Sequence, residues 1–416
     1  MYFSISDPIL RAAEAAEARC AEVFAQREKI SEQTQQKVLR AFIDNRVSAA
    51  HLCGTTGYGY GDIGRDTLDK IMAFALDAED ACVRHTFVSG THALAVALFA
   101  CLRPGDVLVS VTGRPYDTME ETIGLRGNHP GSLAAYGVLY REVALTAEGR
   151  VDHAAIPEAV KGARVCYIQR SRGYSLRPSV FVEEIGRIDA EAKAANPDII
   201  VMVDNCYGEF VETTEPCGVG ADLCAGSLIK NAGGGIAPTG GYVAGRADLV
   251  ELAADRLTCP GMGKEVGCSM DHLRELYMGL FAAPATVCDA VKTAIFAAGL
   301  FAELGYDVLP AYDAPRTDII QSLLLGSAER LSAFCRGLQA GSPVDSYATP
   351  EPWDMPGYDS PVIMAAGCFT NGASIELSAD APIRPPYALW LQGGIHYGSA
   401  KIGILLAAEE TEKLPH

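Results

Sequence analysis

The sequence predicts an α/β fold: a mostly parallel central sheet with helices on both faces, followed by a smaller α+β domain. Three observations support this prediction. From about residue 84 to 245, short apolar runs alternate with helical patterns, as in doubly covered parallel sheets. One run, 199–203, is apolar throughout and ends in Asp204, which is typical of a strand buried on both faces. After about residue 300 the pattern changes to short strands around one helix, which indicates a small antiparallel sheet.

The expected elements are given in chain order. Residues 8–46 come after the helix-start signature Ser-Asp-Pro, and we expect a helical arm made of two helices with a break near 30–31. Strands are expected at 84–88, 107–111, 142–145, 163–169, 199–203, 306–309, 318–325, 362–369, 373–377 and 388–392, and helices at 66–82, 181–195 and 327–339. The predicted domains are the arm at 1–50, a large domain at 51–285 and a small domain at 286–416, with a bridging helix at about 265–300.

Length, charge and cysteines limit the function. The 416 residues fit roughly two to three domains. A net charge of −18 argues against nucleic acid or an anionic membrane as a partner, because both need a basic face. The 13 cysteines are scattered without a Cys-x-x-Cys pair, so we expect reduced, buried thiols, no metal site and a cytoplasmic protein. We find no secretory signal and no run of about 18 apolar residues, so we expect no membrane span.

One lysine stands out in residues 221–241. Lys230 lies between a short apolar run and a loop with five glycines, and no other charged residue occurs between Asp222 and Arg246. Apolar surroundings disfavour an ammonium group, so we expect a lowered pKa. A neutral amine can attack a carbonyl group. We therefore expect Lys230 to carry a cofactor as a Schiff base, with the glycines allowing close packing. Lys264, which is flanked by charge, is expected to face solvent or an interface.

Other groups at predicted strand ends fit the same cofactor. The turn 89–91 (Ser-Gly-Thr) precedes a helix and can bind phosphate through backbone amides. Tyr116 can stack on an aromatic ring, Asp204 can pair with a protonated ring nitrogen, and Ser227 can add a hydroxyl to the phosphate. The set matches pyridoxal phosphate (PLP), whose ring acts as an electron sink. The competing interpretations are a plain helix cap, a packed tyrosine and a strand-end carboxylate, and neither a dinucleotide nor a P-loop motif is present.

With these groups and the motifs around them, the chain resembles fold-type I PLP enzymes of the cystathionine and methionine lyase group. More narrowly, it is similar to the methionine gamma-lyase family, or aluminium-resistance proteins. The resemblance covers most of the chain and is carried by the glycine loop 57–68 (Gly-Tyr-Gly-Tyr-Gly-Asp-Ile-Gly-Arg-Asp-Thr-Leu), 89–93 (Ser-Gly-Thr-His-Ala), 113–117 (Gly-Arg-Pro-Tyr-Asp), 169–174 (Gln-Arg-Ser-Arg-Gly-Tyr), 203–210 (Val-Asp-Asn-Cys-Tyr-Gly-Glu-Phe), 226–231 (Gly-Ser-Leu-Ile-Lys-Asn) and 391–394 (Leu-Gln-Gly-Gly). It implies C–S bond cleavage in a sulfur-containing amino acid by beta- or gamma-elimination, and a homo-oligomer with shared sites, a dimer at least and a tetramer by preference.

The resemblance also implies residue roles. Lys230 would be the Schiff-base lysine and proton shuttle, Asp204 would face the ring nitrogen, and Tyr116 would stack on the ring. The expected phosphate ligands are Ser89, Gly90, Thr91 and Ser227. In the lyase group a tyrosine and an arginine of the neighbouring subunit also reach the phosphate. Tyr60 matches that tyrosine and joins Lys230 and Tyr116 as a catalytic residue.

Two positions depart from the lyase pattern. Asp62 stands where the phosphate-binding arginine is expected, and Arg65 is our candidate replacement. Trp390 occupies the expected place of the arginine that binds the substrate carboxylate, on a strand at 388–392. The candidates for that task are Arg384, Arg170 and Arg172. These departures keep open aldol cleavage or side-chain replacement on the same cofactor. A non-catalytic PLP-fold binding protein is a third interpretation, against which the intact Lys230, Asp204 and Tyr116 argue.

Overall fold

A computed structural model describes residues 2–354 and 360–415 of the chain. The chain forms two compact units, one of Met1–Glu32 with Pro284–His416 and one of Gln33–Ala283. Two long helices, α1 (Asp7–Asp44) and α8 (Leu273–Glu303), contribute residues to both units. The boundary between Ala283 and Pro284 falls inside α8, close to the expected domain limit at 285.

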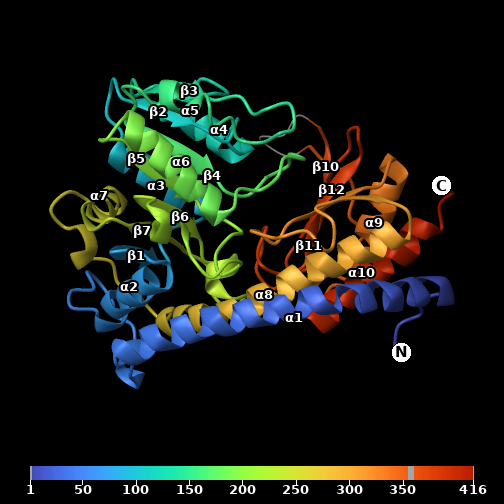
Figure 1. The fold of residues 1–416 in the computed structure, drawn as a ribbon. Coiled ribbons are helices and arrows are strands. Elements are labelled where there is room, and N and C mark those ends of the chain that lie inside the picture. The colour runs from blue at the N-terminus through green and yellow to red at the C-terminus, as the bar shows by residue number, and fades with distance from the viewer. Residues whose placement is uncertain (1, 355–359, 416) are drawn as a thin grey trace. The chain divides into compact units, whose positions relative to one another are not determined.

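A seven-stranded sheet forms the centre of the unit Gln33–Ala283 (Figure 1). Its strands are β1 (Asp80–Arg84), β2 (Val107–Ser110), β3 (Leu139–Glu142), β4 (Val165–Gln169), β5 (Ile200–Asp204), β6 (Leu223–Ser227) and β7 (Gly241–Gly245). They lie in the order β1-β7-β6-β5-β4-β2-β3, and every neighbouring pair is parallel except the two pairs that include β7. All residues of β2, β4, β5, β6 and β7 are buried. The mostly parallel, doubly covered sheet is therefore confirmed.

Helices cover both faces of this sheet, and Figure 1 shows α3 and α6 on opposite sides of it. The helices of this unit are α2 (Ile63–Ala75), α3 (Gly90–Cys101), α4 (Asp117–Ile123), α5 (Ile156–Ala159), α6 (Val182–Ala195) and α7 (Ala247–Leu257), with short 3₁₀ segments at Ala49–Leu52, Pro216–Val219, Asn231–Gly233 and Gly263–Glu265. Side chains of α3 and α7 form one apolar core with the strands. α3 is apolar on nearly all sides because it is enclosed by α7 and the sheet.

The other unit contains a five-stranded sheet in the order β10-β11-β12-β9-β8, in which all pairs are antiparallel. Its elements are β8 (Asp307–Leu309), β9 (Gln321–Leu324), α9 (Ala328–Ala340), β10 (Val362–Ala365), β11 (Ser378–Pro382), β12 (Ala388–Gln392) and α10 (Tyr397–Glu412). α9 packs closely on α10, since a Cβ atom on Gly337 would lie 2.4 Å from the carbonyl oxygen of Leu406. The smaller domain with an antiparallel sheet is confirmed.

The predicted break near residues 30–31 is wrong, because α1 continues from Asp7 to Asp44. No glycine interrupts this segment, and its proline is at the second position, where helices tolerate it. Ser31, at the expected break, lies within the helix, and its hydroxyl donates to the carbonyl oxygen of Pro284 at 3.1 Å. A serine bonded outside its own helix does not compete with the helical backbone.

Three strand predictions need correction. The strands expected at 84–88 and 142–145 lie three or four residues earlier, at β1 and β3. Residues 373–377 do not form a strand, because the Glu376 carboxylate accepts the amides of Phe369 and Thr370 and holds a turn. The strand of this region is β11, at Ser378–Pro382. Its Ser-Ala-Asp-Ala-Pro sequence has low β propensity, and its pairing with β10 and β12 stabilises it.

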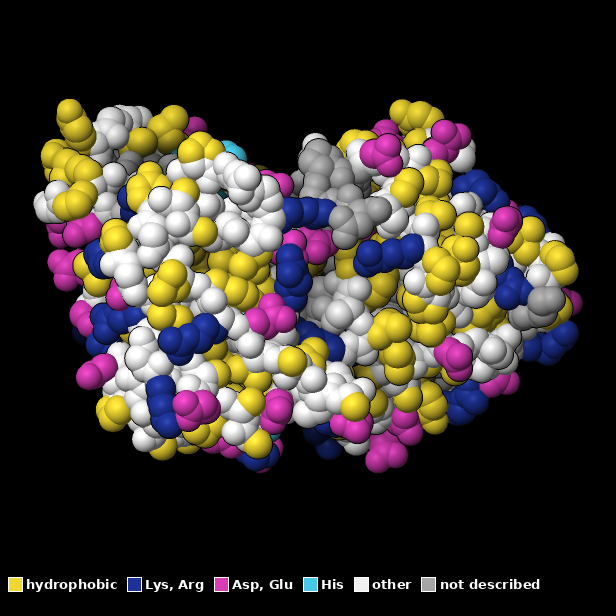
Figure 2. Space-filling view, turned by 90° about the horizontal axis from the view of Figure 1, so that it is seen from above, with side chains coloured by type: hydrophobic (Ala, Val, Ile, Leu, Met, Phe, Trp, Pro, Cys, Tyr) yellow, Lys and Arg dark blue, Asp and Glu magenta, His cyan; other side chains and the backbone are white. Residues whose placement is uncertain are grey.

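The state of the cysteines, the surface charges and the burial of α8 can be compared with the expectations from composition. All thirteen cysteines are free thiols and seven of them are buried, but Cys53 and Cys259 are exposed, so the expectation of buried thiols holds only in part. On the face seen in Figure 2, basic and acidic side chains are interspersed. By length and hydropathy alone α8 could cross a membrane, but 72% of its most apolar window is buried inside the protein. Such burial is typical of a core helix, so α8 is weak evidence for a membrane span.

Candidate active site

The carboxyl ends of β4, β5 and β6 bring the predicted cofactor residues together. These strands are parallel and in register, with Gln169 opposite Asp204 and Asp204 opposite Ala225. Ser227 ends β6, and Lys230 follows it by three residues. Ligands of open α/β sheets bind at this edge of the sheet. The fold thus places Asp204, Ser227 and Lys230 where the sequence predicted a site.

Asp204 is buried at the end of β5, with 7% of its surface exposed. Its Oδ1 accepts the backbone amide of Cys206 at 3.1 Å, and the hydroxyl of Tyr167 lies 3.5 Å from Oδ2. Burial raises the pKa of Asp204, and the Cys206 amide and Lys230 only partly offset that rise. A cationic partner would restore the ionised form. A protonated ring nitrogen is such a partner, so this carboxyl group fits the predicted role.

The amino end of α3 lies against the ends of β5 and β6. A Cβ atom on Gly90 would lie 3.1 Å from Cβ of Ser227 and 3.2 Å from Sγ of Cys206, so a larger residue would require these neighbours to shift. The Oγ of Ser89 caps the helix by accepting the amide of His92 at 3.1 Å. The helix N-terminus beside the Ser227 hydroxyl suits a phosphate, and the residues present therefore fit the phosphate group of PLP. The Ser89 side chain performs the capping task that was the competing interpretation.

Tyr116 lies at the start of α4, next to the same helix end. Its backbone amide donates to Oε1 of Gln169 at 2.6 Å, which ties it to the end of β4. Thr91 on α3 hydrogen-bonds through its hydroxyl to Thr118, two residues after Tyr116, at 2.9 Å. The ring of Tyr174 meets the Tyr116 ring edge to face at 5.9 Å. These contacts fix Tyr116, a rigid aromatic ring beside the predicted phosphate site.

Lys230 is half-buried and faces an aromatic ring. Its Nζ lies 4.2 Å from the centroid of the Tyr207 ring. Burial by itself lowers the pKa of Lys230, but Tyr207, Cys206 and Asp204 outweigh burial and raise the pKa above its ordinary value. The expectation of a lowered pKa is therefore wrong for the chain by itself. The sequence showed the apolar run beside Lys230, whereas the fold adds the carboxylate and the aromatic ring.

The glycines after Lys230 allow close packing, as expected. A Cβ atom on Gly233 would lie 1.7 Å from the carbonyl oxygen of Leu228, and one on Gly234 would lie 2.3 Å from that of Gly279. Gly234 also has a φ of 58°, which disfavours other residues. Neighbouring backbone segments thus fix the short turn that holds Lys230.

Arg170, a predicted substrate ligand, is fully buried in a network below the strand ends. One nitrogen of its guanidinium group donates to Oδ1 of Asn205 at 2.7 Å, and the other pairs with Glu212 at 2.9 Å. The Glu215 carboxylate lies 3.6 Å from the first nitrogen. These contacts give Arg170 the task of holding the turn after β5, beside Asp204.

Arg172 and Arg384 differ in exposure. Arg172 is buried, with Nε 3.4 Å from the hydroxyl of Ser179. Arg384 is exposed in the loop between β11 and β12, and within residues 2–354 and 360–415 its guanidinium group forms no hydrogen bond or ion pair. Trp390 is buried on β12, which has the bounds expected for the strand of the substrate arginine. Of Arg170, Arg172 and Arg384, it is Arg384 whose guanidinium group has no hydrogen-bond or ion-pair partner among the described residues.

The glycine loop separates its aromatic and charged residues. Tyr60 is 64% exposed and stacks on exposed Tyr58 at 5.6 Å, so both rings face outward. Asp62 is buried and caps α2 by accepting the amide of Arg65 at 2.9 Å. Arg65 is also buried, and one guanidinium nitrogen donates to the carbonyl oxygens of Gly59 and Gly267. Arg65 therefore holds the loop in shape, and Tyr60 has the exposure that a residue donated to a neighbouring subunit needs.

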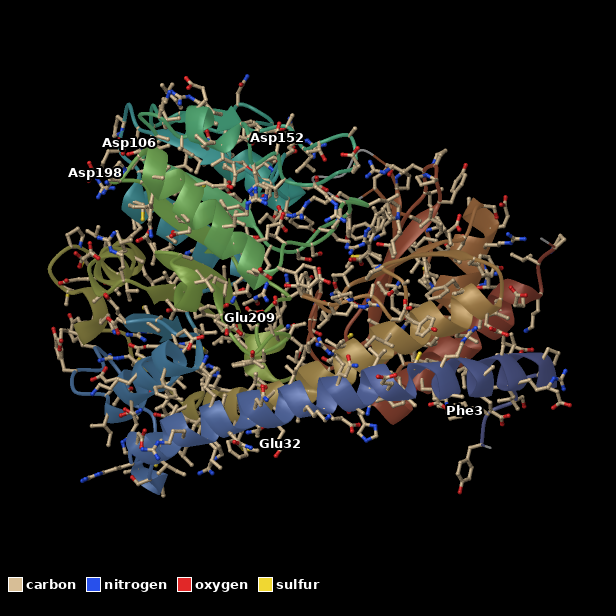
Figure 3. The ribbon with its side chains drawn as sticks, in the orientation of Figure 1. Phe3, Glu32, Asp106, Asp152, Asp198 and Glu209 are labelled. Atoms are coloured by element: carbon tan, nitrogen blue, oxygen red, sulfur yellow. The ribbon has the colours of Figure 1, made fainter. Side chains whose placement is uncertain are left out.

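The sequence reasoning missed a buried acid close to the site. Glu209, labelled in Figure 3, lies in the loop between β5 and β6 and is fully buried. Its Oε1 accepts the Tyr242 hydroxyl at 2.7 Å, and its backbone oxygen accepts the Asn231 side chain at 3.0 Å. Burial raises the pKa of Glu209 to about 8. A glutamate five residues past a strand-end aspartate gives no sequence signal for such burial, because its partners come from distant segments.

Replacing Glu209 with glutamine is expected to make the protein less sensitive to alkaline pH. The folded chain keeps a proton on Glu209 up to a pKa of about 8, whereas the unfolded chain releases it near the ordinary pKa of 4.5. The unfolding free energy therefore falls as pH rises through this window, by up to roughly 1.4 kcal/mol per pH unit. Denaturant midpoints between pH 5 and pH 8 should fall less in Glu209→Gln than in the wild type. Equal slopes in both proteins would show that Glu209 does not hold this proton.

Lys264, the other lysine considered, and two histidines near the amino end of α3 have other partners. Lys264 pairs with Asp80 at 2.6 Å and lies 3.5 Å from a carboxylate oxygen of Asp69. His92 accepts the amide of Val88 at 3.2 Å, and the ring of His85 packs on that of His272 at 4.6 Å. Lys264 joins an ion cluster by β1, and the histidines have structural contacts.

Comparison with known proteins identifies the family. The profile of the methionine gamma-lyase family matches residues 9–412. The uncharacterized protein YnbB of Bacillus subtilis is 49% identical over 395 residues, with 94% of each chain covered. A carbon-sulfur lyase involved in aluminum resistance from Clostridium novyi has a structure with a TM-score of 0.94 at 47% identity, covering 97% of this chain and 96% of that one. This likeness in both sequence and structure extends over nearly the whole chain.

A more distant structure agrees on the fold alone. The PLP-dependent protein YhfS from Escherichia coli has a TM-score of 0.63 at 16% identity, covering 92% of this chain and 96% of that one. It supports the fold-type I architecture that the two sheets indicate. Together with the match over residues 9–412, the comparisons show that this chain belongs to the methionine gamma-lyase family.

Proposed function

We propose that this protein is a PLP-dependent lyase that cleaves a C–S bond in a sulfur-containing amino acid. The observation that carries the proposal is the convergence of Asp204, Lys230 and the α3 amino end at one edge of the sheet, with Gly90 against Ser227. Family membership supports the same cofactor, and the lyase described for Clostridium novyi supports the same bond.

The residues divide the work by position. Asp204 would hold the proton on the ring nitrogen, and Tyr116 would pack on the ring face. The amides of Gly90 and Thr91, with the Ser227 hydroxyl, would bind the phosphate. When bound, PLP supplies a ring that accepts the electron pair left by a departing α-proton.

Lys230 would take that proton and donate one back as a thiol group leaves. Its amine must be neutral to accept a proton, and its neighbours raise its pKa. We therefore propose that these neighbours keep the proton on Lys230 after the first transfer, until the lysine donates it to the leaving thiol group.

Arg384 is our proposed ligand for the substrate carboxylate. Its guanidinium group is exposed and uncommitted among described residues, and arginine binds carboxylates through two parallel hydrogen bonds. Arg170 is engaged by Asn205 and Glu212, so it is poorly suited to the task. Trp390 would then present an apolar side chain at the position where the lyase group has its carboxylate-binding arginine.

The test is a panel of amino acids given to the PLP-loaded protein. With cystathionine, both reactions consume one water: beta-elimination releases pyruvate, ammonia and homocysteine, and gamma-elimination releases 2-oxobutyrate, ammonia and cysteine. Cysteine and methionine test the smaller substrates. We expect equal amounts of a keto acid and of a thiol, or of hydrogen sulfide in the case of cysteine, from at least one of them, and a raised KM in Arg384→Ala.

Two results would contradict the proposal. A preparation that binds PLP but releases no keto acid from any sulfur amino acid would reject the C–S lyase activity. Glycine and an aldehyde released from a β-hydroxy amino acid would instead support the aldol-cleavage alternative, which Trp390 keeps open. The Lys230→Ala protein is the negative control for both the keto-acid and the aldehyde measurements.

We also propose a homo-oligomer with shared sites, at least a dimer and by preference a tetramer. The support is the outward-facing pair Tyr58 and Tyr60 on a loop anchored by buried Arg65. Exposed rings on a fixed loop suit insertion into a neighbouring copy. Light scattering of the active protein should give at least twice the chain mass, and an active monomer would contradict shared sites.

A further inference from the structure

Tyr207 is the side chain that faces the amine of Lys230. The Nζ atom lies 4.2 Å from the centroid of the Tyr207 ring. A cation within about 6 Å of an aromatic centroid is attracted by the negative face of the ring. The contact joins the turn after β5 to the turn after β6.

The backbone at Tyr207 is held in an unusual conformation. Its φ is 69°, and that of Phe210 is 62°, both in the left-handed region that non-glycine residues avoid. Such conformations persist where the surroundings fix them, and they cluster at functional sites. Here Glu215 accepts the amide of Phe210 at 2.8 Å, and the Asn231 side chain donates to the backbone oxygen of Glu209 at 3.0 Å. Asn231, which directly follows Lys230, thus anchors the turn that carries Tyr207.

We propose that Tyr207 is a positioning residue, whose ring keeps the Lys230 amine beside the Asp204 edge of the sheet whenever Lys230 is not bonded to the cofactor. The inference rests on the proposed function, in which Lys230 carries PLP. A lysine side chain has several rotatable bonds, and a released amine would otherwise sample many positions. The ring face restricts that motion and favours the charged form, so the amine stays within reach for the proton transfers.

The groups that act on the charge of Lys230 are Tyr207, Cys206 and Asp204, all at the end of β5 or just after it. Cys206 is buried, and burial raises its pKa, so it is neutral near pH 7. Asp204 stays in place when Tyr207 is changed. Tyr207 acts on Lys230 through both its ring and its hydroxyl, and substitution by leucine removes both.

The experiment measures how fast the PLP-free protein captures added PLP, by absorbance and by borohydride trapping with peptide mapping. Capture needs the neutral amine. Removing the Tyr207 side chain should lower the pKa of Lys230, which increases the neutral fraction of the amine and speeds capture at a fixed pH near 7. We expect Tyr207→Leu to capture PLP roughly threefold or more faster there, a shift of about half a pH unit in the rate–pH profile. Tyr207→Phe keeps the ring but removes the hydroxyl, whose hydrogen bond also raises the pKa of Lys230, so its profile should lie between those of the wild type and Tyr207→Leu. Turnover by the loaded Tyr207→Leu protein should fall because the amine is less well held.

Phe210→Leu is the matched control, since it removes an aromatic ring from the same turn at a similar φ. It should leave the rate–pH profile unchanged even where it costs stability. A Tyr207→Leu profile that slows uniformly, or that equals the Phe210→Leu profile, overturns the positioning role. A wild-type protein that captures no PLP at Lys230 overturns the proposed function itself, so the two failures are distinguishable.

Discussion

Lys230→Ala is expected to lose covalent PLP binding and to lower turnover by at least about a thousandfold. In the proposed function the lysine supplies both the bond to the cofactor and the proton transfers, and positioned proton transfer alone contributes roughly 10²–10⁴-fold. Its position after β6, beside Asp204 and Tyr207, is the reason to expect both losses together. The near-visible absorbance of the purified protein and borohydride trapping check the first loss, and keto-acid release checks the second.

Lys264→Ala is the control for that experiment. Lys264 is also partly buried and charged, but it pairs with Asp80 and lies close to Asp69 by β1. Its loss should leave the absorbance band and the trapped peptide unchanged. If Lys264→Ala loses the band while Lys230→Ala keeps it, the cofactor lysine has been assigned to the wrong residue.

Asp204→Asn is expected to keep covalent PLP binding but to lower turnover by roughly 10²–10³-fold, the usual loss for one preorganised electrostatic contact in a buried site. An amide of nearly the same shape still accepts the Cys206 amide, so the turn after β5 is retained. It cannot hold the positive charge of a protonated ring nitrogen. Turnover per bound cofactor separates this effect from a change in cofactor occupancy.

Asp222→Asn provides the matched comparison. Asp222 is also buried and accepts a strand amide, that of Val201 at 2.8 Å, but it lies just before β6, at the opposite end from Ser227. Its substitution should lower stability and leave turnover per bound cofactor unchanged. Equal losses of turnover in the two variants would mean that Asp204 acts through general stability alone.

The sequence predicted the larger sheet well and parts of the smaller unit poorly. Apolar runs within 163–169 and 199–203 predicted the strands found as β4 and β5, because both faces of a parallel sheet are buried. β11 was missed because Ser-Ala-Asp-Ala-Pro has no strand pattern of its own and depends on its neighbours. The single helix α1 was misread because the partner of Ser31 lies more than 250 residues away.

The candidate cofactor residues could be proposed from the sequence because they lie at or just after strand ends in short, recognisable motifs. Asp204, Ser227 and Lys230 lie within 27 positions, and parallel strands bring such ends together. The arginines were harder, because Arg65 and Arg170 both look like anion ligands in sequence. Both are buried and engaged by neighbours within the fold.

Periodicity and local motifs were enough to predict the fold class, the candidate cofactor lysine and the strand-end residues around it. They encode which strands are buried and which side chains come directly after each strand. The folded chain was needed to see which arginines are already committed, that Glu209 is buried, and that Tyr207 faces Lys230. It also reversed the expected direction of the Lys230 pKa shift. The physical reason is that charge and burial depend on all neighbours in space, and most of those neighbours are distant in the chain.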